Sequence, residues 1–349
     1  MKISDRRAGT GVFRVSAPNR VDLAGGTLDI FPLYLLVEDT TTVNAAISVR
    51  SVVEVRPYRH GVARLQSGNY GITVLAPDTH GIPLAGKLGL LARALRHFPA
   101  VSGVDLVVHN EAPVGSGIGA SSALLVALMT AMGRWTGIRK RWEETALAAM
   151  EIEASHLKSL AGRQDHVAAL RGGIQGIRFF PGGLDAHRLP PGGKAGRMLG
   201  SHGFLAHTGI AHRSSDVNWR MIRGAIEGNA AVLRKFRGIA AAARDAWGAV
   251  SAADPDALGA AVGSEWRIRR TLAEGVSPRK VEALLADRRF RRMVSGAKLC
   301  GAGNGGMLFG LLRDPGDRAA AESILSGAGM SAVPFRLSGG IRVEESGVD

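Results

Sequence analysis

A glycine-rich segment followed by two serines is the part of this sequence best suited to chemistry. It reads Glu111-Ala-Pro-Val-Gly-Ser-Gly-Ile-Gly-Ala-Ser-Ser-Ala123 and leads directly into an apolar, alanine-rich run. Glycines at every second position allow a tight turn in which successive backbone N–H groups point to one place. Ser121 and Ser122 stand where the apolar run begins to read as a helix. Because a helix N-terminus with free N–H groups attracts anions, the segment predicts a phosphate-binding loop.

Other glycine-rich loops fit this segment less well. A P-loop needs a Lys after the glycines, and none follows here. Gly115-x-Gly117-x-x-Ala120 matches a dinucleotide fingerprint only in part, because Glu-Ala-Pro-Val intervenes after the strand-like run 104–109. Taken alone, the segment could also be a plain structural turn before a helix. The paired hydroxyls favour contact with phosphate or Mg²⁺.

Three further segments place polar residues among glycines. The first runs from Ala17 to Asp29 and holds Arg20 beside a glycine pair. The second holds two glutamates and then Ala-Gly-Arg-Gln-Asp, ending at Asp165. The third, 296–306, is another glycine nest between strand-like runs. These segments are candidates for the remaining parts of a phosphate-handling site.

The elements that must position these segments follow from the apolar patterns. Strands are expected at 13–17, 45–58, 104–109, 174–180 and 203–207. Helices are expected at about 119–135, 141–157, 216–234, 240–250, 256–272, 278–285 and 318–325. Pro- and Gly-rich stretches at 181–193 suggest a boundary between two domains, 1–190 and 191–349. This irregular mixture indicates an α+β fold.

Composition sets limits on the class of protein. The 349 residues carry a net charge of +14, with arginine clusters at 267–270 and 288–292 that have few aromatic neighbours. We therefore expect solvated helix faces and no specific nucleic-acid binding. No apolar run is long enough for a membrane span, and no signal peptide is visible. The single Cys300 fits a cytoplasmic protein and is expected to be buried and unreactive.

With the four segments in this order, the chain resembles the GHMP kinases, the family of galactokinase, homoserine kinase, mevalonate kinase and phosphomevalonate kinase. The segment 113–123 is similar to the family's Pro-x-x-x-Gly-Leu-Gly-Ser-Ser nucleotide-phosphate motif. Within the family, the chain looks most like sugar-1-kinases of the D-glycero-D-manno-heptose 7-phosphate kinase and fucokinase type. The matching motifs stand here as Arg20…Ala24-Gly-Gly26, Gln164-Asp165, Thr208-Gly-Ile-Ala-His-Arg213-Ser-Ser215 and Lys298-Leu-Cys-Gly-Ala-Gly303. The likeness runs from about residue 14 to 312.

The resemblance implies a two-domain fold with ATP between the domains. The N-terminal domain would be ribosomal protein S5 domain 2-like, and the C-terminal domain a ferredoxin-like α+β layer. The implied nucleotide-binding residues are Pro113, Gly115, Ser116, Gly117, Ile118, Gly119, Ala120, Ser121 and Ser122.

The resemblance also assigns catalytic and metal roles. Asp165 is implied as the catalytic carboxylate that faces the acceptor hydroxyl, with Arg20 beside it. A Gly-loop hydroxyl and a helical glutamate would bind Mg²⁺. Helical geometry does not choose between Glu151 and Glu153, but the spacing to Asp165 in the sugar-kinase subgroup favours Glu153. Counting from the glycines favours Ser121 over Ser122.

On the acceptor side, Asp29 matches the family carboxylate that binds sugar hydroxyls. The other implied substrate-binding residues are Gly25, Gly26, Arg213, Gly301 and Gly303. Two positions depart from the sugar kinases: apolar Leu28 precedes Asp29, and His166 replaces a Gln after Asp165. These departures concern the identity of the acceptor rather than the type of reaction.

The function implied is ATP- and Mg²⁺-dependent phosphorylation of a small-molecule hydroxyl in carbohydrate metabolism. The preferred acceptor is the anomeric hydroxyl of a sugar or sugar phosphate, of heptose 7-phosphate, fucose or galactose type. The alternatives are a kinase for a mevalonate- or homoserine-like alcohol and a ligand-binding homologue without activity. The protein is expected to be a monomer or homodimer.

Overall fold

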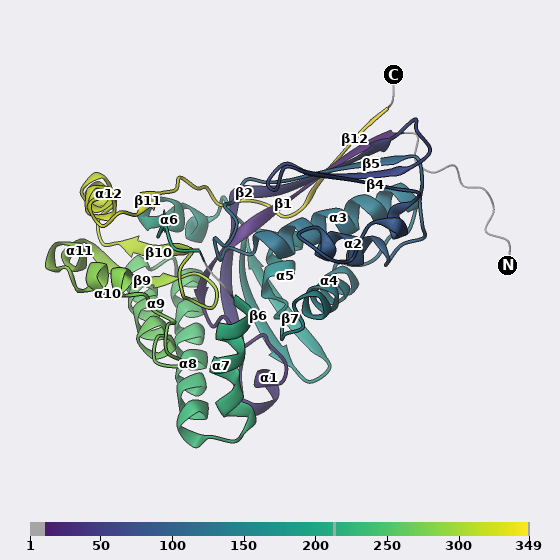
Figure 1. Cartoon of the computed structure of the whole chain (residues 1–349). Helices are drawn as coiled ribbons and strands as arrows, with labels where there is room; N and C mark the ends of the chain where they lie inside the picture. The colour runs from purple at the N-terminus through teal and green to yellow at the C-terminus, as the bar shows by residue number, and fades with distance from the viewer. Residues whose placement is uncertain (1–10, 212–213, 348–349) are drawn as a thin grey trace.

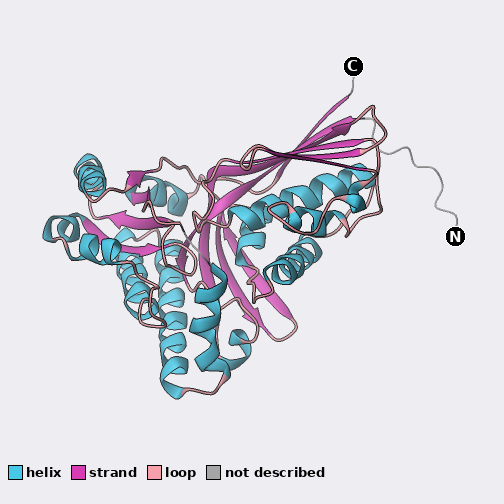
Figure 2. Ribbon diagram, viewed as in Figure 1, coloured by secondary structure: helices cyan, strands magenta, loops and turns pink. Residues whose placement is uncertain are grey.

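The computed structural model describes residues 11–211 and 214–347, which form two β-sheets covered by helices (Figures 1 and 2). The larger sheet has eight strands and the smaller has four. The expectation of an α+β fold is confirmed. None of the described helices is both long enough and apolar enough to cross a membrane.

The larger sheet is built around two long neighbouring strands, β1 and β2. Its strands are β1 Gly11–Ala24, β2 Thr41–Pro57, β3 Ala63–Ser67, β4 Ile72–Ala76, β5 Val104–Asn110, β6 Ile174–Phe180, β7 Gly183–Leu189 and β12 Arg342–Gly347. The order along the main path is β12-β1-β2-β5-β3-β4. One half of β2 pairs with β5 and the other half with β6, which in turn pairs with β7. All pairs are antiparallel except β3 with β5.

The smaller sheet has the order β11-β8-β10-β9. Its strands are β8 Gly203–His207, β9 Val294–Leu299, β10 Met307–Leu312 and β11 Ser331–Ala332. The helices are α1 Leu33–Leu36, α2 Gly89–Leu95, α3 Ala120–Thr136, α4 Trp142–Leu157, α5 Gln164–Arg171, α6 Lys194–His202, α7 Ser214–Ile226, α8 Ala230–Ala252, α9 Pro255–Arg269, α10 Arg279–Ala286, α11 Arg288–Met293 and α12 Arg318–Gly327. Short 3₁₀ turns occur at Thr79–Gly81 and Pro315–Asp317.

β1 and β2 run through both halves of the structure. At one end, Val15 and Val53 pack in the core that contains α3. At the other end, Val21 and Val43 pack with Phe309 of β10 in a second core. A continuous two-stranded ribbon therefore holds the loop before α3 in a fixed relation to the smaller sheet. Figure 1 shows this ribbon passing between the two groups of helices.

Helix α3 follows from its sequence. Its residues are mostly apolar and most of them are buried against the sheet. Gly119 precedes the helix and Gly137 ends it, both with left-handed backbone (φ 72° and 75°). Such residues suit glycine because the left-handed region strains side chains with a Cβ atom. The predicted helix at 119–135 is thus present almost as expected.

Two expectations about elements were wrong in detail. The helix expected at 216–234 is interrupted, since α7 ends at Ile226 and α8 begins at Ala230. Gly228 has φ 77°, and the side chain of Asn229 accepts hydrogen bonds from Ala231 N and Val232 N, which starts a new helix. The separate helix expected at 240–250 is the second part of α8. The boundary at 190 stays a prediction, while β12 lies in the larger sheet beside β1.

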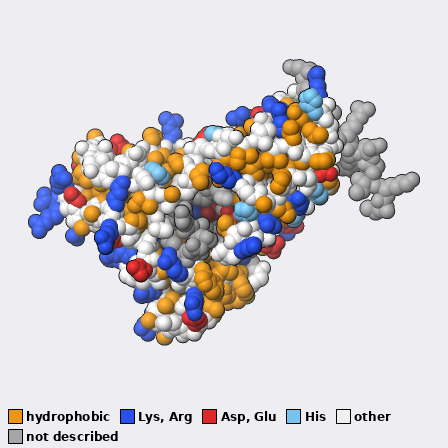
Figure 3. All heavy atoms as spheres, in the orientation of Figure 1, with side chains coloured by type: hydrophobic (Ala, Val, Ile, Leu, Met, Phe, Trp, Pro, Cys, Tyr) orange, Lys and Arg blue, Asp and Glu red, His pale blue; other side chains and the backbone are white. Residues whose placement is uncertain are grey.

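Large apolar side chains are exposed over α1 and α7. They include Phe31, Leu35, Trp219 and Ile226. Figure 3 shows apolar atoms gathered at this corner of the molecule, whereas Lys and Arg are scattered over the rest of the visible face.

The packing of α3 leads to a stability prediction. Leu128 is fully buried in the core beneath the larger sheet. Leu128→Ala should lower the free energy of unfolding by about 2–5 kcal/mol, because it leaves a cavity. Leu75, which is 60% exposed, serves as the control, and Leu75→Ala should change the stability by less than about 0.5 kcal/mol. Urea unfolding of both variants gives the comparison, and equal losses would contradict this core assignment.

Candidate active site

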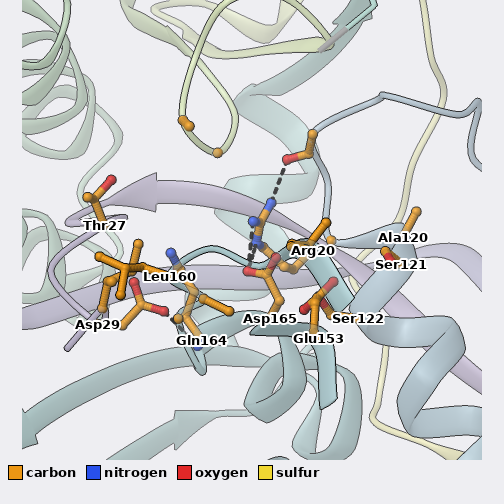
Figure 4. A pocket seen from close by; sticks show the side chains of 18 of the residues that line it. Arg20, Thr27, Asp29, Ala120, Ser121, Ser122, Glu153, Leu160, Gln164 and Asp165 are labelled. Atoms are coloured by element: carbon orange, nitrogen blue, oxygen red, sulfur yellow. Dashed lines mark hydrogen bonds and ion pairs between the residues drawn. The ribbon is translucent and has the colours of Figure 1, made fainter. Parts of the chain in front are cut away.

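A pocket lies where five segments of the chain meet. They are the Gly loop before α3, the turn after β1, the end of α4, the start of α5 and the loop between β9 and β10. Figure 4 shows Arg20 and Asp165 near the centre, with Thr27 and Asp29 on one side and Glu153, Ser121 and Ser122 on the other. Residues separated by more than a hundred positions in the sequence thus face one cavity.

The Gly loop has the backbone that an anion cradle needs. Gly115, Gly117 and Gly119 all have positive φ, at 75°, 73° and 72°. The first turn of α3 has no side-chain cap. A Cβ on Gly119 would lie 3.1 Å from a carboxylate oxygen of Asp165. The loop therefore offers backbone groups at a helix N-terminus and lies close to the carboxylate.

Arg20 and Asp165 form a short ion pair. Nε and Nη2 of Arg20 both lie 2.7 Å from Oδ1 of Asp165, and Nη1 donates to Gly117 O at 2.8 Å. Arg20 is 4% exposed, whereas Asp165 is 21% exposed and lines the pocket. Burial disfavours the charge on Arg20, but Asp165 and Asp22 outweigh it and raise the pKa of Arg20. Arg20 therefore stays charged, and one carboxylate oxygen of Asp165 is free of Arg20.

Glu153 faces the pocket, whereas Glu151 on the same helix is exposed and does not line it. The carboxylate of Glu153 accepts a hydrogen bond from Ser122 Oγ at 2.8 Å and lies 3.2 Å from Nε2 of buried His166. Burial alone would raise the pKa of Glu153. The contacts with His166, Ser122 and Ser121 lower the pKa by more, so the net shift is downward. This side of the pocket holds an ionised carboxylate beside two hydroxyls.

This group of oxygens suits a hard cation. Among the described residues, no cluster of three or more His, Cys, Asp or Glu is arranged to hold a metal. Mg²⁺ does not need such a cluster, because it keeps several waters and binds few protein oxygens together with substrate phosphates. One carboxylate and the neighbouring serine hydroxyls next to an anion cradle fit that preference.

Asp29 occupies the opposite side of the pocket. It is buried and accepts a hydrogen bond from Gln164 N at 3.0 Å. Burial raises the pKa of Asp29 to about 6, although the Gln164 bond lowers it in part. A Cβ on Gly162 would lie 1.9 Å from Asp29, so only glycine fits there. A carboxylate held in this way can accept hydrogen bonds from ligand hydroxyls.

The structure brings most of the predicted site residues together. Those that line the pocket are Arg20, Asp29, Gly115, Ser116, Gly117, Gly119, Ala120, Ser121, Ser122, Glu153, Asp165 and Gly301. Those that do not line it are Gly25, Gly26, Pro113, Ile118 and Gly303. Arg213 lies outside the described residues.

Two of the residues that do not line the pocket support its wall. Ile118 is buried in the core, and its carbonyl accepts a hydrogen bond from Arg20 N at 3.0 Å. Gly25 has φ 81°, and a Cβ there would lie 2.1 Å from Thr41 O. Both positions therefore fix the backbone that carries Arg20 and Asp29.

Sequence reasoning missed several residues of the site. Thr27 and Leu160 line the pocket, and so does Gln164, which the sequence indicated only as part of the Gln164-Asp165 motif. His166 was noted only as a departure, yet it is fully buried against Glu153. A signal was available for His166, since it follows Asp165 directly and α5 turns it toward α4.

The chain is similar to known proteins in sequence and in fold. Residues 87–173, which include the Gly loop, Glu153 and Asp165, match the family "GHMP kinases N terminal domain". The structure of a D-glycero-D-manno-heptose 1-phosphate kinase from Bacteroides thetaiotaomicron is similar with a TM-score of 0.74 at 20% identity. That similarity covers 95% of this chain and 98% of the other.

Two curated proteins are similar in sequence. The mevalonate kinase of Methanothermobacter thermautotrophicus is 39% identical over 71 residues, which is 20% of this chain and 23% of that protein. The L-fucokinase/L-fucose-1-P guanylyltransferase of Bacteroides fragilis is 24% identical over 348 residues, which is 89% of this chain and 35% of that protein. The matches thus span about a quarter to a third of these relatives' own lengths.

The raised pKa of Asp29 predicts a pH-dependent stability. Since the folded-state pKa of about 6 exceeds the reference value of 3.8, the fold favours the protonated form. The stabilisation is present below about pH 4 and is lost as the pH rises through 6, a change on the order of 3 kcal/mol. Asp29→Asn lacks this dependence, so it should gain stability relative to wild type between pH 4 and 7.

Urea unfolding at several pH values measures this difference. Asp245→Asn, at an exposed position on α8, is the matched control. The same pH dependence in wild type and Asp29→Asn would show that Asp29 does not titrate in this way.

Proposed function

On the premise that the chain belongs to the GHMP kinase superfamily, we propose that it transfers the γ-phosphoryl group of ATP to a hydroxyl of a small molecule. The observation that carries the proposal is the ion pair of Arg20 and Asp165, which lies against the Gly loop and in the same pocket as Asp29. An anion cradle, a charged pair and a hydroxyl-binding carboxylate are the parts that phosphoryl transfer requires.

The Gly loop would hold the phosphates of ATP. Its three left-handed glycines and the uncapped start of α3 present backbone N–H groups, and the helix dipole adds positive charge there. Glu153 with Ser121 and Ser122 would hold Mg²⁺. When bound, Mg²⁺ neutralises charge on the phosphates and orients them.

The chemical step uses Asp165 and Arg20, which lie between the Gly loop side of the pocket and the side with Asp29 (Figure 4). The acceptor oxygen forms a bond to the γ-phosphorus, and the bond from that phosphorus to the β–γ bridging oxygen breaks, releasing ADP. The hydroxyl proton passes to Asp165, whose free carboxylate oxygen faces the pocket. Arg20, which is paired with Asp165, offsets negative charge on the transferring group.

The preferred acceptor is the anomeric hydroxyl of a sugar or sugar phosphate. Asp29 supports this choice, because a carboxylate can accept hydrogen bonds from two neighbouring hydroxyls. The names of two similar proteins, a heptose 1-phosphate kinase and an L-fucokinase, point the same way. Leu28, which departs from the sugar-kinase motif, is buried in the core, and Thr27 lines the pocket in its vicinity. The departure therefore does not put an apolar side chain on the acceptor.

An alcohol such as mevalonate is the second candidate acceptor. Its specific support is the similarity to a mevalonate kinase over 71 residues. A homologue without activity is less well supported, because the Arg20–Asp165 pair and the Glu153–Ser122 bond are both formed. A cytoplasmic location and a monomeric or dimeric state remain predictions.

The two glutamates of α4 allow a matched test of the metal site. Glu153→Gln should raise the Mg²⁺ concentration for half-maximal rate by at least about tenfold. It should also reduce the increase in melting temperature that Mg²⁺ and ATP together produce. Glu151→Gln, at an exposed position on the same helix, should change neither. A larger effect of Glu151→Gln in both assays would move the metal site to that residue.

The catalytic assignment is tested with Asp165→Asn. This variant keeps the shape of the side chain but removes its charge and its ability to take a proton. We expect kcat to fall by at least about 10², with the Kd for nucleotide near that of wild type. Acceptor-dependent ADP release gives the rate, and calorimetric titration gives the Kd. Asp245→Asn is the control, and full turnover by Asp165→Asn would remove the mechanism proposed here.

A further inference from the structure

Four charged side chains form a buried row of alternating sign behind the pocket, here called the charge row. Arg269 of α9 bonds Glu265 at 2.6 Å, Glu265 lies 3.1 Å from Nζ of Lys298, and Lys298 lies 2.9 Å from Asp22 of β1. All four side chains are 0% exposed. Burying four charges is costly, and apolar residues of similar volume would often be as stable. Stability alone therefore does not explain why these four charges are buried.

Arg269, at one end of the charge row, holds the turn that follows β1. Nη1 of Arg269 donates to Thr27 Oγ1 at 2.9 Å, and Nη2 donates to Gly26 O. A single guanidinium thus bonds a carboxylate, a hydroxyl and a backbone carbonyl. Arg is suited to this because its planar fork carries five donors in fixed directions, whereas Lys offers a single ammonium.

The backbone of this turn is strained at Thr27, which has φ 76°. A β-branched residue in the left-handed region is rare, and it persists only where its surroundings fix it. Two backbone hydrogen bonds close the turn, from Leu28 N to Gly25 O and from Ile30 N to Thr27 O. Arg269 adds the contacts that reach the turn from another part of the chain.

The same turn forms one wall of the pocket. Thr27 and Asp29 both line it, and Asp29 accepts the hydrogen bond from Gln164 N, next to Asp165 in the sequence. In Figure 4 the side chains of Thr27 and Asp29 lie on the same side of Asp165. A shift of this turn would therefore move Asp29 relative to the catalytic carboxylate.

Asp22, at the other end of the charge row, lies near Arg20. Burial disfavours the charge of Asp22, but Lys298, Arg269 and Arg20 outweigh it and lower the pKa of Asp22. The negative charge of Asp22 also contributes to the raised pKa of Arg20. The buried charges thus contact the turn that carries Asp29 and act on the partner of Asp165.

We propose that Arg269, held by Glu265, which in turn pairs with Lys298, is a positioning residue that fixes the Gly25–Ile30 turn, and with it Asp29, for binding of the acceptor. The part played by the acceptor rests on the proposed function. Arg269 does not line the pocket and acts through Thr27 and Gly26.

Arg269→Lys tests the proposal while keeping the buried charge. Lys has one nitrogen in place of the three that bond Glu265, Thr27 and Gly26, so it cannot reach all three acceptors. Amide hydrogen exchange of residues 25–30 should therefore become about tenfold faster in the protein without ligand. With an acceptor found by screening sugars, sugar phosphates and mevalonate, its KM should rise by about tenfold. The KM for ATP should stay within about twofold, because Glu265, Thr27 and Gly26, the hydrogen-bond partners of Arg269, all lie outside the Gly loop.

The matched control is Arg223→Lys. Arg223 also pairs with a glutamate four residues away, Glu227, but both are exposed on the surface of α7. This variant should leave amide hydrogen exchange of residues 25–30 unchanged. The KM values for the acceptor and for ATP should also stay unchanged. Arg223→Lys makes the same substitution in the same type of helical ion pair, at a position that does not contact the turn.

A second variant guards against misfolding of Arg269→Lys. Thr27→Val removes the hydroxyl but leaves all four buried charges in place, and it should also raise the acceptor KM. The combined variant should be no worse than the stronger single one, because both variants remove the bond between Arg269 and Thr27. Additive effects would show that the residues act separately and would overturn the proposal.

The remaining outcomes are also decisive. Unchanged exchange in 25–30 would overturn the proposal whatever the activity, and so would faster exchange with an unchanged acceptor KM. A wild-type protein that phosphorylates no acceptor would refute the proposed function. In that case the exchange of the variants still decides whether Arg269 holds the turn.

Discussion

The ion pair of Arg20 and Asp165 is the interaction on which the arrangement of the pocket depends. It joins three segments that are far apart in sequence, because Arg20 lies on β1, Asp165 on α5, and Arg20 also donates to Gly117 O in the Gly loop. Because Arg20 is almost fully buried, loss of Asp165 would leave its charge without its hydrogen-bonded carboxylate partner. The geometry that would bring phosphate, acceptor and base together is thus fixed by one guanidinium.

Two kinds of constraint surround this pair. On the Gly loop side, left-handed glycines keep the backbone close to Asp165, since a Cβ on Gly119 would crowd its carboxylate. On the acceptor side, the turn with Asp29 is held by a second guanidinium, that of Arg269. Asp22 interacts electrostatically with both arginines. The protein therefore uses buried, paired charges at the places where position matters most for chemistry.

The sequence predicts the parts of the site whose signal is local. Three alternating glycines before an apolar helix indicate the loop and α3, and motif order indicates that Asp165 and Arg20 belong to one site. The break between α7 and α8 was missed because both sides carry helical patterns, and Asn229 caps only the second helix. Arg269 was read as part of a solvated cluster, since its partners Thr27 and Gly26 are brought to it only by tertiary packing. Contacts of this kind cannot be predicted from one sequence without the fold.

The central claim is that this pocket transfers a phosphoryl group to a sugar hydroxyl. The most direct measurement is ³¹P and ¹H NMR of reactions that contain the protein, Mg²⁺, ATP and one sugar or sugar phosphate at a time. The account predicts that ADP and a new phosphate ester form together, with phosphorus coupled to the anomeric proton of one acceptor. ADP formation without any new ester, or an ester only on an alcohol such as mevalonate, would contradict the claim.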